Sequence, residues 1–83
     1  MLKSLADCVR AKFALGILPH ENPSKLWVSW GSGSLCAGCD EPIRAPQTEY
    51  ELEFEREPSI RLHAECHGLW NTQRRRRRGR RRE

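Results

Sequence analysis

Apolar residues near the start of the chain recur at intervals of three and four. These residues are Leu2, Leu5, Val9 and Phe13. Such spacing places them on one face of a helix, so the pattern predicts a short amphipathic helix over residues 2–15. Gly16 fits the left-handed position that follows a helix, and Pro19 prevents the helix from resuming.

Residues 19–34, "PHENPSKLWVSWGSGS", are predicted to form a loop on composition. Prolines open the segment and glycines close it. Trp27 and Trp30 are the exception, because an indole ring is too large and apolar to leave wholly in water. We expect at least one of the two to cover a small core.

A strict alternation of apolar and polar residues runs from Thr48 to Arg56. The apolar positions are Tyr50, Leu52 and Phe54, and the polar ones are Glu49, Glu51, Glu53 and Glu55. This period of two predicts a strand with one buried face and one wet face. A break at residues 57–59 precedes a second alternation over residues 60–63, so we expect an antiparallel hairpin in which Arg61 faces a glutamate. We interpret the glutamates as a solvated strand face rather than as catalytic carboxylates.

After His63 the pattern becomes helical. The residues near one face are Cys66, Leu69, Trp70 and Gln73. Arginine is a good helix former, but consecutive arginines repel one another, so we expect helical order to fade between residues 74 and 78. Together the elements predict a small α+β fold: a β-hairpin plus a C-terminal helix, with an N-terminal helix packed on it.

Size and composition indicate that this fold needs reinforcement. The chain has 83 residues and is 37% hydrophobic, and a domain of this size usually needs a disulfide, a metal or a partner. The first residues lack the unbroken apolar stretch of a signal peptide, since Asp7, Arg10 and Lys12 interrupt it. We therefore expect a cytoplasmic protein, in which clustered cysteines are typical of metal sites rather than of disulfides.

Two pairs of residues form the strongest chemical signal. "CAGC" supplies Cys36 and Cys39, and "HAEC" supplies His63 and Cys66. Two residues between ligands allow both members of a pair to reach one tetrahedral ion, and the hairpin returns the second pair to the first. Four protein ligands leave no position for water. The sequence therefore predicts one structural Zn²⁺ that stabilises the hairpin, and no enzyme activity.

Other interpretations of these residues stay open. His67 lies four residues after His63 and competes with Cys66 as the fourth ligand. Thiolate is a strong zinc ligand and H-x2-C mirrors C-x2-C, which favours Cys66 and leaves His67 as a surface histidine. An iron–sulfur cluster usually has four thiolates, and a Cys/His nucleophile pair would lose both groups to a metal. Cys8 is interpreted as a small apolar core residue.

The segment from Cys36 to Trp70, "CAGCDEPI…YELEF…IRLHAECHGLW", resembles the CCHC zinc modules of the treble-clef group. That group includes the first module of LIM domains and the poly(ADP-ribose) polymerase-type finger. The chain is also similar to small bacterial zinc-binding proteins with a G-x-L-P segment, here "GILP", and a Trp before the cysteines. The resemblance implies the same four metal ligands, Cys36, Cys39, His63 and Cys66.

Charge is distributed unevenly along the chain. Residues 74–83 hold eight arginines and one glutamate, a net charge of +7, whereas residues 1–73 hold seven Lys/Arg and ten Asp/Glu, a net charge of −3. We therefore divide the chain into an N-terminal helix (1–18), a Trp-containing loop (19–34), a CCHC zinc module (35–73) and an arginine-rich tail (74–83).

The tail predicts binding to the backbone of DNA or RNA with little sequence selectivity, because guanidinium groups neutralise phosphates and bond to their oxygens. The residues expected to bind are Arg74, Arg75, Arg76, Arg77, Arg78, Arg80, Arg81 and Arg82. The alternative is a protein–protein interaction module, an adaptor or regulator, that uses the Trp27/Trp30 region or the acidic strand face. A passive solubilising tail, or a tail folded back onto the glutamates, is also open. The sequence indicates no membrane span and no small-molecule substrate.

Overall fold

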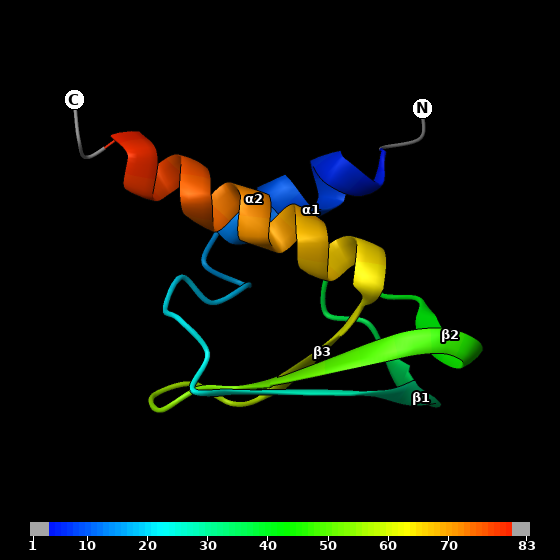
Figure 1. Ribbon diagram of the computed structural model, residues 1–83. Coiled ribbons are helices and arrows are strands. Elements are labelled where there is room, and N and C mark those ends of the chain that lie inside the picture. Colours follow the sequence, from blue (N-terminus) through cyan, green and yellow to red (C-terminus); the bar gives the residue numbers. More distant parts are fainter. Residues whose placement is uncertain (1–3, 81–83) are drawn as a thin grey trace.

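Two helices lie on one side of a three-stranded antiparallel sheet (Figure 1). The computed structural model describes residues 4–80, and for residues 77–80 it describes the backbone only. In chain order the elements are α1 (Leu5–Ala14), β1 (Lys25–Leu35), β2 (Pro42–Glu53), β3 (Ile60–His63) and α2 (Ala64–Arg80). The predicted small α+β fold is confirmed. Neither helix is long and apolar enough, within residues 4–80, to cross a membrane.

The helix predicted over residues 2–15 is present as α1 over Leu5–Ala14, so it starts later than predicted: Ser4 is extended, and residues 2–3 lie outside the described part of the chain. The side chain of Ser4 caps its first turn by accepting a hydrogen bond of 3.1 Å from the backbone N–H of Asp7. At the other end Gly16 has a φ of 79°, and the N–H of Ile17 donates to the carbonyl of Lys12 over 2.9 Å. These features form a Schellman motif, which needs a residue that adopts the left-handed conformation without strain. Gly16 meets that need.

The sheet has β2 at its centre, with β1 on one side and β3 on the other. The predicted hairpin is confirmed, because β2 pairs with β3 from Glu49 opposite His63 to Leu52 opposite Ile60. The predicted loop over residues 19–34 is wrong from Lys25 onward, where the chain forms β1 and pairs with β2.

Gly31 in β1 has a packing role that the sequence did not reveal. The pairing shifts between Trp30 and Ser32, and at Gly31 the two backbones come so close that a Cβ atom would lie 2.4 Å from the carbonyl oxygen of Ile43. Gly31 therefore permits a bulge inside a strand rather than a loop.

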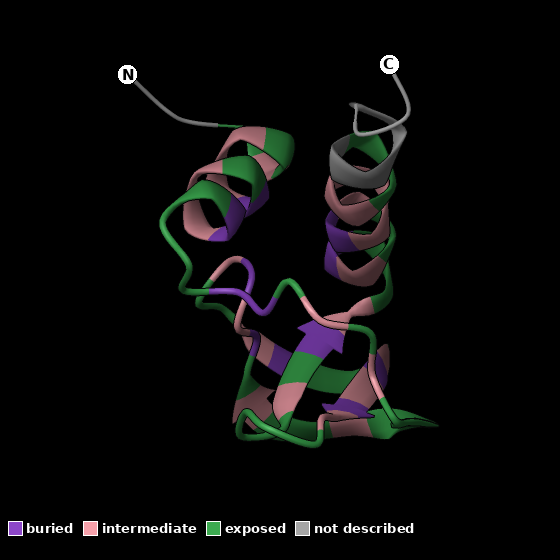
Figure 2. Cartoon of the chain, turned by 90° about the vertical axis from the view of Figure 1, so that its left-hand side faces the viewer, coloured by how far each residue is buried: buried purple, intermediate pink, exposed green. Residues whose placement is uncertain are grey.

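The core lies where the helices face each other and over the part of the sheet that they cover (Figure 2). Its buried residues are Val9, Phe13, Leu18, Cys36, Ile43, Leu52, Leu62, Cys66 and Trp70. The expectation that Trp27 or Trp30 covers this core is wrong, since their exposed fractions are 52% and 69%. Trp70 takes that role. Its ring is fully buried and its Nε1 donates to the carbonyl of Pro19 over 2.8 Å.

Glu49 departs from the predicted wet face of β2. Only 4% of the residue is exposed, and its carboxylate accepts hydrogen bonds from the N–H and the hydroxyl of Ser32, at 2.9 and 2.8 Å. Arg61 lies opposite Glu51 on β3, with Nε 2.9 Å from Glu49 and a second contact of 3.4 Å to Glu51, so it faces glutamates across the strands as the sequence predicted. Burial alone would raise the pKa of Glu49, but the Ser32 donors and the Arg61 charge hold it below its usual value.

Helix α2 continues through the arginine run to Arg80, so the expected loss of helical order between residues 74 and 78 is wrong. Arg74 is part of the folded body. Its guanidinium carbon lies 4.4 Å from the centre of the Trp70 ring, and its nitrogens donate to the side chains of Asn22 and Asn71. Arg74, the first residue of the predicted tail, therefore contacts the folded body.

Candidate metal centre

The structure brings the four predicted ligands together from three parts of the chain. Cys36 and Cys39 lie in the connection between β1 and β2, His63 is the last residue of β3, and Cys66 lies in the first turn of α2. Their ligand atoms are all within 4.8 Å of one another. The sulfur of Cys39 is 3.4 Å from Nδ1 of His63. These four residues could hold a metal ion.

Backbone hydrogen bonds shape the first ligand pair. The carbonyl of Cys36 accepts from the N–H of Asp40 over 2.8 Å, and Asp40 closes this turn with a φ of 67°. The N–H of Ala37 donates to the carbonyl of Arg61 over 2.8 Å, which ties the turn to β3. The pair is therefore fixed relative to His63 by backbone hydrogen bonds.

Gly38 allows the two ligand pairs to meet. A Cβ atom at this position would lie 3.0 Å from Cβ and 3.2 Å from Sγ of Cys66, and 3.3 Å from a methyl group of Val9. A larger residue would push α2 and α1 away from the turn. Glycine is required here by close approach rather than by an unusual backbone angle.

Helix α1 is attached to the same turn by a charged side chain. Nζ of Lys12 donates to the carbonyl of Ala37 over 3.0 Å and lies 2.8 Å from the carboxylate of Asp40. Val9 lies beside Gly38 in the core. The position of α1 therefore depends on the shape of the ligand turn.

The thiols differ in how readily they ionise. Burial raises the pKa of Cys36, but N–H groups of His63, Cys39 and Gly38 directed at its sulfur bring the pKa down to about 7. Burial raises the pKa of Cys66 and of Cys39, and the charge of Cys36 raises both further. Three thiolates in one small space repel one another. A cation among them would reverse this effect, which is the electrostatic condition for a thiolate metal site.

The donor set and its spacing fit a tetrahedral zinc ion. With Zn–S and Zn–N bonds of about 2.3 and 2.0 Å, sulfur and nitrogen at two corners of a tetrahedron lie roughly 3.5 Å apart. The separation of 3.4 Å between Cys39 and His63 matches that value, and the four ligand atoms as a group lie within 4.8 Å of one another. Three thiolates and one imidazole are also a common combination in structural zinc sites.

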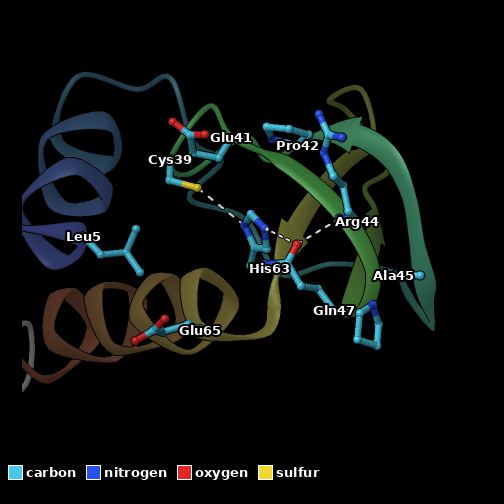
Figure 3. Close-up of a pocket in the computed structure, with 10 residues that line it drawn as sticks. Leu5, Cys39, Glu41, Pro42, Arg44, Ala45, Gln47, His63 and Glu65 are labelled. Carbon is cyan, nitrogen blue, oxygen red and sulfur yellow. Dashed lines mark hydrogen bonds between the residues drawn. The ribbon is translucent and has the colours of Figure 1, made fainter.

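Gln47 contacts the imidazole of His63 from the side away from the sulfur of Cys39, as Figure 3 shows. Its side-chain oxygen is 3.3 Å from Nε2 of His63 and accepts a second hydrogen bond of 2.8 Å from the N–H of Arg44. A proton on Nε2 leaves Nδ1 free to bind metal on the side of Cys39. Gln47 was not among the predicted site residues, because a lone glutamine in a strand carries no motif.

Replacing Gln47 with alanine is expected to lower metal affinity about 10- to 100-fold, the usual effect of removing a group that orients a ligand histidine. Gln47→Glu keeps an acceptor oxygen and should recover most of the loss. Competition with a chromophoric chelator measures both effects, and Gln73→Ala on α2 is the control. Equal affinities for Gln47→Ala and the unmodified protein would contradict the assignment of this role to Gln47.

An open hollow of about 750 Å³ adjoins the ligands. Figure 3 shows Cys39 and His63 on its wall, with Glu41 and Arg44 from the strand side and Glu65 from α2. A chelator therefore has a path to this side of the centre.

His67 and Cys8 lie outside the ligand group. The ring of His67 stacks on Tyr50 with 4.6 Å between ring centres, and the residue is half-buried rather than on the surface as predicted. Its pKa is lowered by burial and by the charge of Arg74. Cys8 is half-buried on α1 and forms no disulfide. The arrangement supports Cys66, and not His67, as the fourth ligand.

The arginines expected to bind nucleic acid are only partly described. Arg75 and Arg76 are exposed on α2, whereas Arg74 packs on Trp70. For Arg77, Arg78 and Arg80 the backbone is helical. Arg81 and Arg82 lie outside the described residues.

Comparison of the chain with known protein families, with curated proteins and with solved structures gave no match. The function is therefore inferred from the site and the surface of the molecule itself.

Proposed function

We propose that this protein is a non-enzymatic zinc module whose C-terminal arginine helix binds the phosphate backbone of nucleic acid with little sequence selectivity. The observation that carries the proposal is the continuity of α2. The helix contains the ligand Cys66 in its first turn and continues without interruption to Arg80. Fourteen residues of helix span roughly 20 Å, so the arginines extend from a base that the metal fixes.

The zinc ion in this proposal has a structural role. Four protein ligands fill a tetrahedral shell and leave no position for water or substrate. The order of the parts, a ligand turn, a hairpin and then a helix that supplies the last ligand, resembles the treble-clef modules. Four cysteines without a disulfide suit a reducing compartment such as the cytoplasm.

The surface of α2 supports backbone contacts rather than base reading. Arg75 and Arg76 are exposed, and guanidinium groups bond to phosphate oxygens in pairs. The run from residue 74 to residue 82 holds no aromatic residue to stack on a base. We therefore propose affinity for DNA and RNA backbones, and a weak response to base sequence.

If five of the arginines after Arg74 engage phosphates, the plot of log affinity against log salt should have a slope of roughly −4.5 on duplex DNA and −3.5 on a single strand. Between about 50 and 200 mM salt the affinity for duplex DNA should then fall roughly 500-fold. Fluorescence anisotropy with labelled DNA and RNA of several sequences measures both quantities.

One variant changes Arg75, Arg76, Arg77 and Arg78 together to glutamine. Glutamine preserves helix propensity, and Arg74 stays in place on Trp70. This change should abolish most of the binding at about 150 mM salt and leave metal content unchanged. Arg56→Gln removes one exposed arginine away from the tail and serves as the control. A slope near zero, or equal affinity with and without the four arginines, would overturn the proposal.

A protein-interaction module is the second candidate, and the exposure of Trp27 and Trp30 favours it. The acidic strand face is a weaker basis, because Glu49 is buried and Arg61 pairs with both Glu49 and Glu51. Binding through the tryptophans should survive loss of the tail arginines, whereas nucleic-acid binding should not.

A further inference from the structure

The face of the sheet that forms the core continues past the helices onto β1. Leu52 and Tyr50 on β2 lie beneath α2, with Leu52 fully buried and Tyr50 stacked on His67. Their partners on β1 are Leu26 and Val28, and Trp30 follows on the same side. The exposed fractions of these three β1 residues are 47%, 58% and 69%. These three residues, Leu26, Val28 and Trp30, form an apolar strip on the part of the sheet that the helices do not cover.

The outer edge of β1 is also unprotected. Within the described residues no strand pairs with this edge, and every residue from Lys25 to Trp30 is exposed. Soluble proteins usually protect such edges with several charges, proline or a covering loop. Here Lys25 is the single charged residue of the segment, and the bulge lies beyond it, after Trp30. The regular part of β1 can accept another strand.

We propose that the occupant of this edge is β1 of a second copy of the chain, paired antiparallel about a two-fold axis at Val28. Opposite residues of an antiparallel pair point to the same side of a sheet. In this register Val28 faces Val28, and Leu26 faces Trp30 of the second copy, so the two apolar strips combine. The pairing places every exposed inner-face residue of one copy opposite an apolar residue of the other.

The charge distribution and the shape of the β1 edge are both compatible with β1 of a second copy. The two Lys25 side chains lie at opposite ends of the paired segment, roughly 20 Å apart, which is beyond the screening length at physiological salt. Next to Trp30 a hollow of about 390 Å³ is lined by Val28, Ser29 and Thr48. Leu26 of the second copy lies opposite this hollow and can fill it.

The area is sufficient for a weak dimer. A tryptophan side chain buries up to about 250 Å², so the exposed fraction of Trp30, which lies on the paired face, corresponds to roughly 170 Å² in each copy. With Leu26, Val28 and the paired backbone, the total stays below the lower limit of about 1,200 Å² for stable specific interfaces, in the range of weak ones. We therefore expect a weak dimer whose population depends on protein concentration.

The pairing joins two sheets into one of six strands. A two-fold axis perpendicular to the sheet keeps both pairs of helices on the same side. Both C-terminal arginine helices then leave the dimer from one face. The dimer does not depend on the nucleic-acid proposal, since neither β1 nor the apolar strip includes a tail residue.

Sedimentation equilibrium of the metal-loaded full chain, from about 1 µM to 1 mM, tests the dimer. The unmodified protein should approach twice its mass of 9.7 kDa. Val28→Lys and Val28→Glu each place like charges across the axis and should weaken the dimer at least about 100-fold. An equal mixture of these two variants should dimerise again, because opposite charges then face each other.

Leu15→Lys is the matched control, since Leu15 is 75% exposed but lies outside β1. It should leave the dimer intact. Metal content and the dispersion of the amide NMR spectrum show whether each variant is folded. An unmodified protein that remains monomeric at about 1 mM, or a folded Val28→Lys variant that still dimerises, would overturn the proposal.

Discussion

Removing the metal from the cluster of Cys36, Cys39, His63 and Cys66 is expected to unfold the whole described body and not only the ligand segment. Zinc binding in finger peptides contributes about 10–16 kcal/mol at neutral pH. A complete small domain is stable by about 5–15 kcal/mol. Loss of the ion is therefore expected to remove as much free energy as the whole stability of a domain of this size.

The turn at residues 36–40, which carries Cys36 and Cys39, contacts α1, and these contacts explain why loss of the metal should also unfold that helix. Cys36 and Cys66 are themselves fully buried core residues. Lys12 of α1 donates to the carbonyl of Ala37, and Val9 of α1 lies against Gly38. When the turn loses its shape, α1 loses its docking surface as well.

Two-dimensional NMR of the protein with and without a strong chelator measures this effect, and Cys39→Ala should reproduce it. The dispersed amide spectrum should collapse and should return when zinc is restored. Cys8→Ser is the control, because Cys8 lies outside the cluster. A metal-free sample with an unchanged, dispersed spectrum would falsify the structural role of the ion.

The second large expected effect concerns which residues of the segment "HAECH", residues 63–67, bind the metal. Cys66→Ser and His63→Ala are each expected to lower metal affinity by more than about 100-fold, since even loss of a group that only orients a ligand costs 10- to 100-fold. His67→Ala should leave affinity nearly unchanged, because His67 lies outside the ligand group and stacks on Tyr50.

Metal competition ranks the three variants, and the absorption spectrum of the Co²⁺-substituted protein counts the thiolates. The unmodified protein and His67→Ala should show the same sulfur-to-cobalt bands, and Cys66→Ser should show weaker ones. The opposite order of Cys66 and His67 would mean that the site is Cys2His2.

Much of the local structure follows from short patterns in the sequence. The helical spacing near the start of the chain identifies α1, and Gly16 marks its end, because hydrogen bonding and the left-handed turn are decided within a few residues. The alternation around Leu52 and the break after it determine the β2–β3 hairpin in the same way. The two C/H-x2-C pairs identify the four residues that the structure brings together as a possible metal site, since a separation of two residues allows both members of a pair to reach one ion.

The position of Gln47 shows where local patterns stop being informative. Its hydrogen bond to His63 joins residues sixteen positions apart, across two strands. Nothing in the residues next to Gln47 specifies that contact, because it depends on the register of β2 and β3 and on the direction of the imidazole. Arg74 is similar, since the tail composition suggests a solvated residue whereas the packed body provides Trp70, Asn22 and Asn71 as partners.

The sequence by itself determined the elements that are encoded in a few neighbouring residues: the presence of the two helices, the hairpin, and the four residues that cluster as a possible metal site. Only the tertiary structure decided which faces are covered. Glu49 and Trp30 both contradict their hydropathy, since Glu49 is buried by Ser32 and Arg61 while Trp30 remains 69% exposed on an edge strand. The physical reason is that burial depends on what packs against a residue, and those neighbours come from distant parts of the chain.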